Sequence, residues 1–226
     1  MKIDFSQAPF IVGTVTTWEA LQAFPSRKDI HCDILEARLD HIGWIEDWLP
    51  ACKAIESMGI PVLLTLRMKI EGGKWDELDE GRQEILELAL TELAAIDVEL
   101  QSNLVPRLCR KAAELGKTVV ISHHDFNETP SEERLREIAI DMASYDNSVI
   151  KMATHVNQEE DIERLEALLA QDFRRPICLI GMGDLGQRTR VEFPDKGSAL
   201  TYAYLDSPSA PGQLSCAEAA KQLGRS

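Results

Sequence analysis

The sequence of 226 residues predicts an α/β fold, an eight-stranded parallel (β/α) TIM barrel that occupies residues 1–226 as a single domain. Short runs rich in β-branched residues alternate about eight times with longer segments whose apolar residues recur every three or four positions. Such alternation implies parallel strands joined by crossover helices. The length also fits, because barrels of this class commonly take about 200 to 250 residues as one domain.

Each predicted strand is a short apolar run in which residues of high β propensity gather. In chain order the strands are FIVGTV (10–15), DILEARL (33–39), IPVLLTL (60–66), AIDVEL (95–100), TVVIS (118–122), SVIKMA (148–153), PICLIG (176–181) and ALTYA (199–203). Segments of helical period lie between them, at 81–94, 104–116, 131–144 and 157–171. Ser131, Asn157 and Gly116 supply capping signals at the ends of these helices.

The main alternative fold is a doubly wound open sheet, which has the same alternation of strands and helices. No G-x-G-x-x-G follows the first strand and no Walker motif occurs, so the nucleotide-binding versions of that fold lose support. The sequence also contains no internal repeat, linker or low-complexity tract. These observations favour the barrel.

Composition narrows the classes of partner. The chain carries 24 basic against 38 acidic side chains, a formal charge of −14, which disfavours nucleic acid and anionic membrane surfaces. No apolar run reaches about 18 residues and residues 1–7 lack the features of a secretion signal, so we expect a cytoplasmic protein. The five cysteines form no C-x-x-C pair and are expected to be small, buried apolar side chains.

Charged side chains occupy strand positions at which a barrel interior would be apolar. Glu36, Arg38 and Asp40 alternate along one strand, so a period of two sends them to one face. A solvated edge strand would also explain them, but both faces of a covered parallel sheet are buried. Charges on one face then indicate the open mouth, where the active sites of barrels lie.

The next two strands show the same pattern. Arg67 and Lys69 alternate with apolar residues at the end of the third strand, and Glu71 follows before a Gly-Gly turn. The fourth strand carries Asp97 and Glu99 at a spacing of two. These two carboxylates either neutralise the neighbouring arginines or take a direct part, and the sequence leaves both roles open.

Histidines and a lysine lie at the ends of the fifth and sixth strands. Adjacent strands are about 4.8 Å apart, so a histidine of SHHDF (122–126) and Lys151 can share one small ligand. A lysine in an apolar run is unfavourable as a cation, which favours an amine that attacks a carbonyl, and a nearby histidine can transfer protons. An ion-paired or snorkelling lysine is the alternative. The pairing indicates lyase or aldolase chemistry.

A metal site is the competing use of the histidines. His123, His124 and Asp125 are consecutive, and neighbours on a strand point to opposite faces of the sheet. They cannot readily bind one ion, so no metal site is expected.

Two loops near the C-terminus supply further polar groups. GMGDLGQRTR (181–190) combines three glycines with Arg188 and Arg190, which resembles a backbone nest with a cationic side chain for an anion. Ser209 and Gln213 offer neutral hydrogen-bonding groups in the loop SPSAPGQLS (207–215).

Together these segments resemble type I 3-dehydroquinate dehydratase, the Schiff-base enzyme of the shikimate pathway, over nearly the whole chain. The similarity rests on seven segments in the expected order. They are DILEARLDH, TLRMKIEGG, IDVEL, SHHDF followed by TP, IKMA, the M-G-x-x-G-x-x-T-R of the seventh loop, and GSALTYA leading to SAPGQ.

The resemblance implies that Lys151 condenses with the ketone of 3-dehydroquinate to form an imine. It implies that His124 is the general acid and base, and that Glu71 orients this histidine. It further implies that the substrate is held by Glu36, Arg38, Arg67, Arg190, Ser209 and Gln213. No cofactor and no metal are implied, and a homodimer is the expected assembly.

Three positions depart from the family pattern. Gly181 and Thr189 replace residues that are usually serine, and Thr14 stands where a serine of the first strand often contributes to the site. We therefore include Thr14 among the residues expected to contact the substrate.

Two other functions remain to be compared with this one. A class I aldolase barrel would use the same lysine, but it would not require Arg38, Arg67 and Arg190 together. A non-catalytic binding descendant would be expected to have lost Lys151 or His124, and both residues are present.

Overall fold

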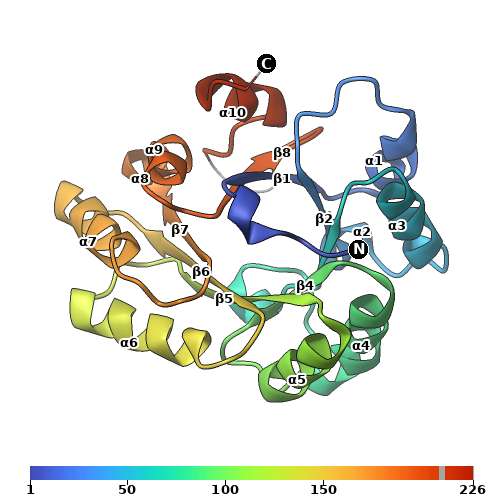
Figure 1. Ribbon diagram of the computed structural model, residues 1–226, viewed down its shortest axis with the longest axis horizontal. Coiled ribbons are helices and arrows are strands. Elements are labelled where there is room, and N and C mark those ends of the chain that lie inside the picture. The colour runs from blue at the N-terminus through green and yellow to red at the C-terminus, as the bar shows by residue number, and fades with distance from the viewer. Residues whose placement is uncertain (209–211, 226) are drawn as a thin grey trace.

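The eight predicted strands form one parallel sheet that is rolled into a barrel, with helices around its outside (Figure 1). The computed structural model describes residues 1–208 and 212–225. The strands are β1 (Phe10–Val15), β2 (Ile34–Arg38), β3 (Val62–Thr65), β4 (Ala95–Glu99), β5 (Thr118–Asp125), β6 (Ser148–His155), β7 (Ile177–Met182) and β8 (Leu200–Tyr204). Their spatial order follows the chain without a reversal, with β8 beside β1. The predicted barrel is confirmed, and the doubly wound sheet is wrong.

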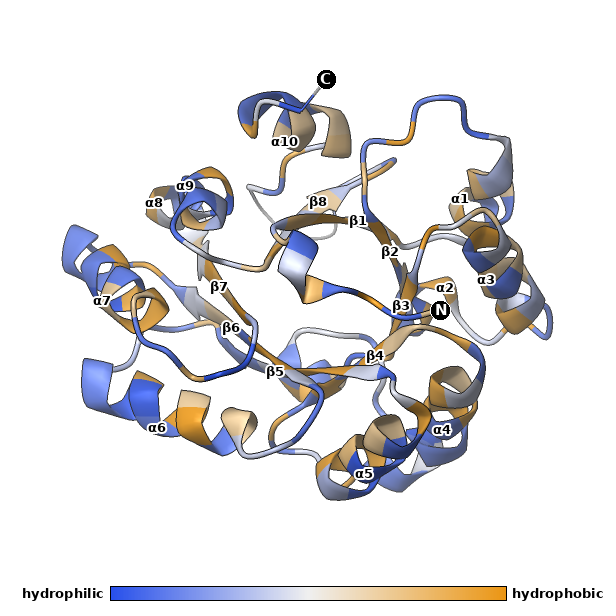
Figure 2. Ribbon diagram, in the orientation of Figure 1, coloured by the Kyte–Doolittle hydropathy of each residue, from blue (hydrophilic) through white to orange (hydrophobic). Residues whose placement is uncertain are grey.

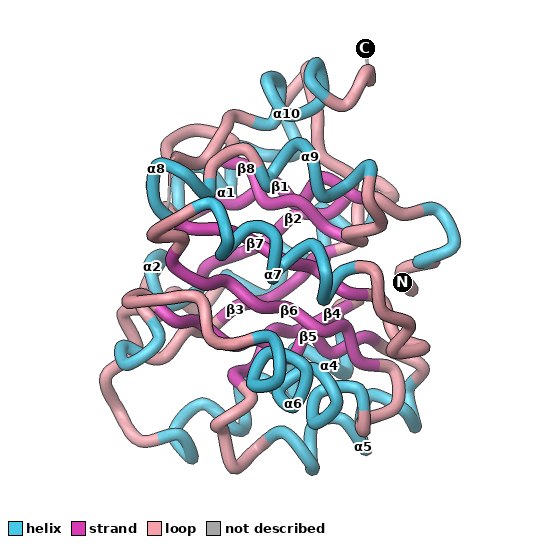
Figure 3. The backbone as a smooth tube through the Cα atoms, turned by 90° about the vertical axis from the view of Figure 1, so that its left-hand side faces the viewer, coloured by secondary structure: helices cyan, strands magenta, loops and turns pink. Residues whose placement is uncertain are grey.

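The barrel is nearly closed between β7 and β8. Within the described chain these two strands share no ladder of backbone hydrogen bonds. Instead the amide of Ala199 donates to the carbonyl of Ile177 at 2.7 Å, and the amide of Leu179 donates to the Ser198 hydroxyl at 3.4 Å. The side view in Figure 3 shows the strands side by side inside the layer of helices.

The helices agree with the predicted segments where those were assigned. They are α1 (Trp18–Ala23), α2 (Leu39–Ile42), α3 (Trp48–Ser57), α4 (Gln83–Glu92), α5 (Val105–Leu115), α6 (Glu132–Ala143), α7 (Glu159–Leu169), α8 (Gly183–Gly186), α9 (Thr189–Asp195) and α10 (Cys216–Gln222), with 3-10 turns at Phe5–Gln7, Phe24–Ser26, Lys69–Glu71 and Asp79–Arg82. Ser131 caps α6, and Gly116 ends α5 in the left-handed conformation. At α7, by contrast, the N-cap is Gln158 rather than Asn157, because the carboxylate of Asp161 accepts both of their amides.

Apolar side chains form one layer between the sheet and the helices and a second layer inside the barrel. In Figure 2 many of the strand residues are accordingly coloured as hydrophobic. At one level inside the barrel every strand contributes one residue, namely Val12, Ile34, Leu63, Ala95, Val120, Val149, Cys178 and Leu200, and Ala153, Ile180 and Tyr202 extend this cluster toward the carboxyl ends. Ile3, Phe5 and Phe10 pack against this inner layer from the N-terminal segment. Four of the five cysteines are buried as expected, and Cys32 is half-buried.

A mostly polar layer lies directly above the apolar one. Because side chains alternate along a strand, the residue two positions further on points into the same barrel interior. These residues are Thr14, Glu36, Thr65, Asp97, Ser122, Lys151, Ile180 and Tyr202, and all of them are buried. The interior therefore changes from apolar to polar within one step along every strand except β7, where Ile180 keeps the second layer apolar.

Strands β5 and β6 are longer than predicted. Both continue past the ends of the apolar runs, so His123, His124 and Asp125 all belong to β5. Ser122 pairs with Lys151, and His124 pairs with Ala153. Among the described residues, no helix combines the length and the apolar character needed to cross a bilayer.

Candidate active site

A cavity of about 270 Å³ opens at the carboxyl ends of the strands. Its lining includes nine of the predicted site residues, which are Thr14, Glu36, Arg38, Arg67, Glu71, His124, Lys151, Arg190 and Gln213. The tenth, Ser209, lies outside the described residues. The lining also contains six residues that were not predicted, which are Gly72, Phe126, Ala153, Ile180, Met182 and Tyr202.

Lys151 is buried at the floor of this cavity. Its Nζ donates to Oδ2 of Asp97 at 2.8 Å and lies 4.3 Å from the centre of the Tyr202 ring. An ammonium group over an aromatic face is attracted by the negative charge of the ring face. The amine is therefore held from two sides, and neither partner was assigned to it from the sequence. Tyr202 could have been found from its register, since it lies two residues after Leu200 in β8.

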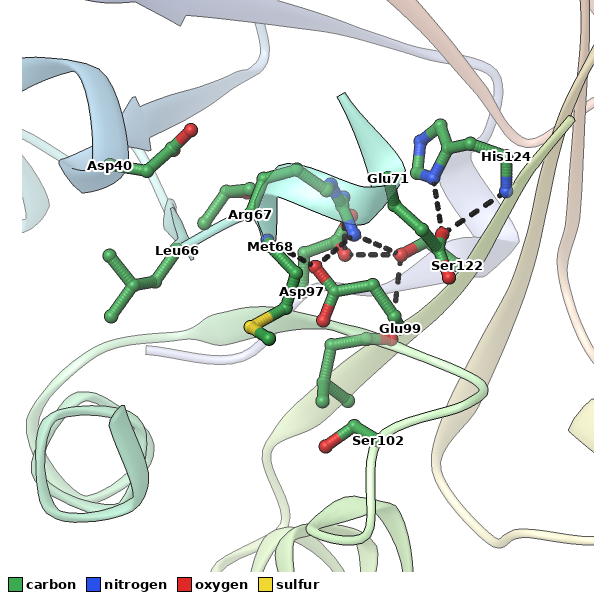
Figure 4. Close-up of polar contacts among 12 residues, drawn as sticks. Asp40, Leu66, Arg67, Met68, Glu71, Asp97, Glu99, Ser102, Ser122 and His124 are labelled. Atoms are coloured by element: carbon green, nitrogen blue, oxygen red, sulfur yellow. Dashed lines mark hydrogen bonds and ion pairs between the residues drawn. The ribbon is translucent and has the colours of Figure 1, made fainter. Parts of the chain in front are cut away.

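Asp97 connects Lys151 to Arg67. Nη2 of Arg67 lies 2.6 Å from Oδ1 of Asp97, and the Ser122 hydroxyl donates to the same oxygen at 2.6 Å (Figure 4). Burial acts to raise the pKa of Asp97, but the charges of Arg67 and Lys151 outweigh it and hold that pKa well below its ordinary value. Asp97 thus remains an anion between two cations, which answers the question that the sequence left open about this carboxylate.

His124 and Glu71 form a hydrogen-bonded pair at the rim. Nδ1 of His124 lies 2.9 Å from Oε2 of Glu71, and the His124 amide donates to the same oxygen at 3.2 Å (Figure 4). Burial, followed by the charges of Arg67 and Lys151, lowers the pKa of His124 well below its ordinary value. An ionised Glu71 can only accept, so Nδ1 then carries the hydrogen and Nε2 is left as a base.

Glu71 itself titrates in the physiological range. Burial raises its pKa to about 7, with Arg67 acting in the opposite direction and Glu99 and Asp97 reinforcing the rise. The glutamate lies six residues after the end of β3, in the 3-10 turn Lys69–Glu71, which is capped by Gly72 with a φ of +79°. A Cβ at that glycine would lie 2.5 Å from Cζ of Phe126, so this turn requires glycine.

The two adjacent histidines diverge, as strand alternation requires. His124 lines the cavity, and its ring stacks on Phe126 with the ring centres 6.2 Å apart. His123 does not line the cavity, as expected for the alternate position on the strand. Burial lowers the pKa of His123 as well. Only one histidine of the pair therefore faces Lys151.

Glu36 is fixed by two threonines. The hydroxyl of Thr14 donates to Oε2 at 2.8 Å, and the hydroxyl of Thr65 donates to Oε1 at 2.7 Å. Each carboxylate oxygen retains capacity to accept a further hydrogen bond from a ligand. Thr14 thus lines the cavity and also orients Glu36.

Arg38 is held by Asp40 in a two-pronged ion pair. Nε and Nη2 of Arg38 lie 2.9 and 2.8 Å from the two oxygens of Asp40. The prediction that Asp40 alternates into the barrel mouth is wrong, because β2 ends at Arg38 and Asp40 lies in α2. The same prediction for Lys69 is also wrong, since β3 ends at Thr65 and Lys69 is exposed.

Arg190 enters the cavity from α9. The side chain is buried, and its Nη1 donates a 3.4 Å hydrogen bond to the carbonyl of Tyr202. Its Nε has no hydrogen-bond partner among the described residues, and burial lowers its pKa. Arg188, which we expected beside it, instead pairs with Glu159 and Glu192 at the surface. The cationic group of this loop is therefore Arg190.

The two other departures from the family pattern meet in the turn after β7. The amide of Gly181 donates to the Thr189 hydroxyl at 2.9 Å, and that hydroxyl donates to the carbonyl of Gly186 at 2.7 Å. A Cβ at Gly181 would lie 2.9 Å from Cα of Gly186, so a serine there would require the turn to shift. Glycine at 181 and threonine at 189 are thus one local arrangement, and neither residue lines the cavity.

Comparison with known proteins points to the same enzyme family as the residues that line the cavity. The sequence model of the family described as type I 3-dehydroquinase matches residues 11–225. The 3-dehydroquinate dehydratase of Methanococcoides burtonii is 33% identical over 227 residues, covering 97% of this chain and 95% of that protein. The protein of the same name from Methanosarcina acetivorans is 38% identical over 203 residues, or 84% of this chain and 83% of that protein.

Solved structures give the same result. The 3-dehydroquinate dehydratase of Geobacillus kaustophilus superposes with a TM-score of 0.84 at 26% identity, covering 96% of this chain and 91% of that chain. That of Aquifex aeolicus gives 0.81 at 29% identity, with 94% and 96% covered. Since the family match spans nearly the whole chain and the relatives align over most of their own length, this chain belongs to the type I 3-dehydroquinase family.

Proposed function

We propose that this protein dehydrates 3-dehydroquinate to 3-dehydroshikimate through an imine on Lys151, with His124 as general base and acid. The observation that carries the proposal is the placement of a buried amine and a neutral imidazole on adjacent strands of one cavity. Asp97 and the Tyr202 ring hold the amine, while Glu71 holds the imidazole.

The chemistry follows from these two groups. Lys151 first transfers a proton to Nε2 of His124, and the free amine then attacks the substrate ketone. His124 returns this proton as the addition product loses water and forms the protonated imine. Nε2 of His124 removes a proton from the adjacent carbon, and the imine accepts the electron pair. His124 then returns its proton to the departing hydroxyl, so a second water leaves. Hydrolysis of the conjugated imine releases 3-dehydroshikimate and restores the amine.

We assign the substrate carboxylate to Arg190. Arg67 is engaged by Asp97 and Glu99, and Arg38 is engaged by Asp40. Arg190 presents a buried positive charge to the cavity without such an ion pair among the described residues. Glu36, Arg38, Arg67 and Gln213 are then placed to contact the ring oxygens, and Ser209 is assigned with them from the family resemblance.

Replacement of Arg190 by glutamine tests this assignment. Loss of a charge-assisted contact to the carboxylate should raise KM by about 10- to 100-fold with a smaller effect on kcat. Arg188→Gln is the matched control, because this arginine lies two residues away but at the surface. Steady-state kinetics on 3-dehydroquinate measure both variants. An Arg190→Gln enzyme with the KM of the wild type would contradict the assignment.

The raised pKa of Glu71 predicts how kcat/KM depends on pH. Above pH 7 the ionised carboxylate accepts from Nδ1–H of His124, and Nε2 is available as base. As the pH falls through the raised pKa of about 7, Glu71 takes up a proton and this support is lost. We therefore expect kcat/KM to fall below pH 7.

Measurement of kcat/KM from pH 5 to pH 9 checks this expectation. Glu71→Gln should have lower activity throughout and should lack the decline near pH 7. Glu46→Gln, which removes an exposed carboxylate, should retain it. A decline near pH 7 that persists in Glu71→Gln would assign the titration to another group.

The proposed function has a direct test. Purified protein mixed with 3-dehydroquinate should generate the ultraviolet absorbance of the conjugated enone, and borohydride should fix ligand mass on the peptide that contains Lys151. An aldolase would instead release a smaller fragment without the enone. If the absorbance never rises, the proposed reaction is wrong.

A further inference from the structure

We propose that Arg82 is a positioning residue for the reaction, which acts by fixing Arg67 against Asp97 and thereby Asp97 against Lys151. The inference rests on the proposed function and extends it to a residue outside the cavity. Arg82 ends the 3-10 turn Asp79–Arg82, is fully buried, and does not line the cavity. A fully buried arginine requires a specific set of partners.

Arg82 is bound on one side to the backbone next to Arg67. Its Nη1 donates to the carbonyl of Leu66 at 2.6 Å. That carbonyl belongs to the peptide bond between Leu66 and Arg67. The contact therefore fixes the backbone on the N-terminal side of Arg67.

Glu99 holds the backbone on the C-terminal side of Arg67, so Arg82 and Glu99 together form a clamp around this residue. Nη2 of Arg82 lies 2.5 Å from Oε2 of Glu99, although the N–H is not aligned as a hydrogen bond. The second oxygen, Oε1, accepts the amide of Met68 at 2.9 Å and lies 3.0 Å from Nη1 of Arg67 (Figure 4). The Met68 amide belongs to the peptide bond between Arg67 and Met68. The Arg82 and Glu99 pair thus holds both peptide bonds of Arg67.

This clamp restrains the backbone beyond the point at which pairing between strands ends. Pairing between β3 and β4 ends at Thr65 and Asp97, two residues before Arg67. Beyond that point the amide of Trp75, which donates to the carbonyl of Arg67 at 3.1 Å, is the other backbone restraint on this residue. Arg67 would otherwise be a long side chain on a loop, yet it must keep its 2.6 Å contact with Asp97.

Removal of Arg82 has two consequences. The backbone at 66–68 loses one restraint, so the Arg67 guanidinium is no longer fixed beside Asp97. The carboxylate of Glu99 also loses a cation and retains Arg67 as its remaining cationic neighbour, which draws Arg67 away from Asp97. Asp97 then holds Lys151 less firmly, although every group that touches the substrate is still present.

The test compares Arg82→Lys and Arg82→Met with the wild type. A misplacement of about 1 Å can lower a rate about 100-fold, and we expect this loss of kcat/KM for Arg82→Met. Lysine keeps the charge without the planar fork, so Arg82→Lys should lose about 10-fold. Both variants should also form the borohydride-trapped imine more slowly. Thermal unfolding verifies that each variant is folded.

Arg164 provides the matched control. Its Nη2 likewise donates to a backbone carbonyl, that of Thr129 at 3.1 Å, and it also contacts a buried carboxylate, Asp161. This clamp lies outside the cavity and touches no residue of the Arg67 network. Arg164→Lys and Arg164→Met should lower the unfolding temperature while kcat/KM stays within about 3-fold of the wild type.

The pH profile separates positioning from a loss of stability. Arg82→Met leaves Glu99 less neutralised, and Glu99 already raises the pKa of Glu71. The decline of kcat/KM should therefore begin at a higher pH in Arg82→Met, and it should stay in place in Arg82→Lys and in both Arg164 variants. A variant that is only less stable has no reason to shift this decline.

The outcomes are distinct. A wild type that never converts 3-dehydroquinate refutes the proposed function, and the inference falls with it. An active wild type whose folded Arg82 variants keep kcat/KM within about 3-fold, with an unshifted decline, refutes the inference alone. If Arg82→Met does not fold, Arg82→Lys decides, since a value of kcat/KM equal to that of Arg164→Lys would overturn the positioning role.

Discussion

Lys151→Met is expected to reduce turnover of 3-dehydroquinate by at least about 10⁴-fold and to abolish the borohydride-dependent gain of ligand mass. The substitution removes the amine to which we assign imine formation but keeps an unbranched side chain of similar length over the Tyr202 ring. Asp97 keeps Arg67 and Ser122 as partners, so we expect the variant to remain folded. Absorbance of the enone measures the first effect, and mass spectrometry of the peptide measures the second.

The matched control is Lys196→Met, which removes an exposed lysine that pairs with Glu166. It should retain both turnover and trapping. Trapping that persisted in Lys151→Met at the level of this control would show that the imine forms elsewhere, and the mechanism proposed above would then be wrong.

The second large effect is the loss of kcat expected when the proposed general base, His124, is replaced. His124→Ala should lose about 10³- to 10⁴-fold in kcat, because proton transfer in both the abstraction and the elimination step is removed. The amine of Lys151 is untouched, so borohydride should still fix substrate on this variant. Separate measurement of turnover and of trapped mass distinguishes the two steps.

His123→Ala is the control that the strand itself provides. This residue is adjacent in sequence but does not line the cavity. We expect it to keep most of the wild-type activity. Equal losses for the two histidine variants would mean that the assignment of the base by strand alternation is incorrect.

Much of the fold follows from local periodicity. All eight strands lie where β-branched runs alternate with helical segments, since this pattern depends on which face of each element is buried. The residues at which the strands end were less predictable than the strands themselves. The apolar run TVVIS (118–122) was given as the fifth strand, yet β5 continues through the two histidines to Asp125 at the mouth of the barrel, where polar side chains are accommodated.

The candidate site was predictable where strand register determines it. Glu36, His124 and Lys151 all line the cavity. Period two sends the two adjacent histidines to opposite faces, and the family resemblance selected His124 from the pair. Asp40 and Lys69 were misplaced because the same period was extended past the end of the strand. Where a strand ends depends on tertiary contacts, which the spacing of residues does not contain.

The partners of the charged groups could not be read from the sequence. Arg82 and Glu99 are 17 residues apart and come from a 3-10 turn and a strand, so nothing in local spacing connects them. Local spacing does not connect Tyr202 with Lys151 either, because their contact joins β8 to β6 across the barrel. Both contacts depend on the closure of the sheet and on side-chain direction, which appear only in three dimensions.

The change from apolar to polar layers inside the barrel also bears on how the strands are aligned. A shift of one strand by a single residue would turn its inner apolar side chain and its functional side chain outward together. Selection for a working site and selection for a packed core therefore constrain the same alignment. Along each strand, tolerance of substitution should change abruptly over two positions, since the first affects folding and the second affects catalysis.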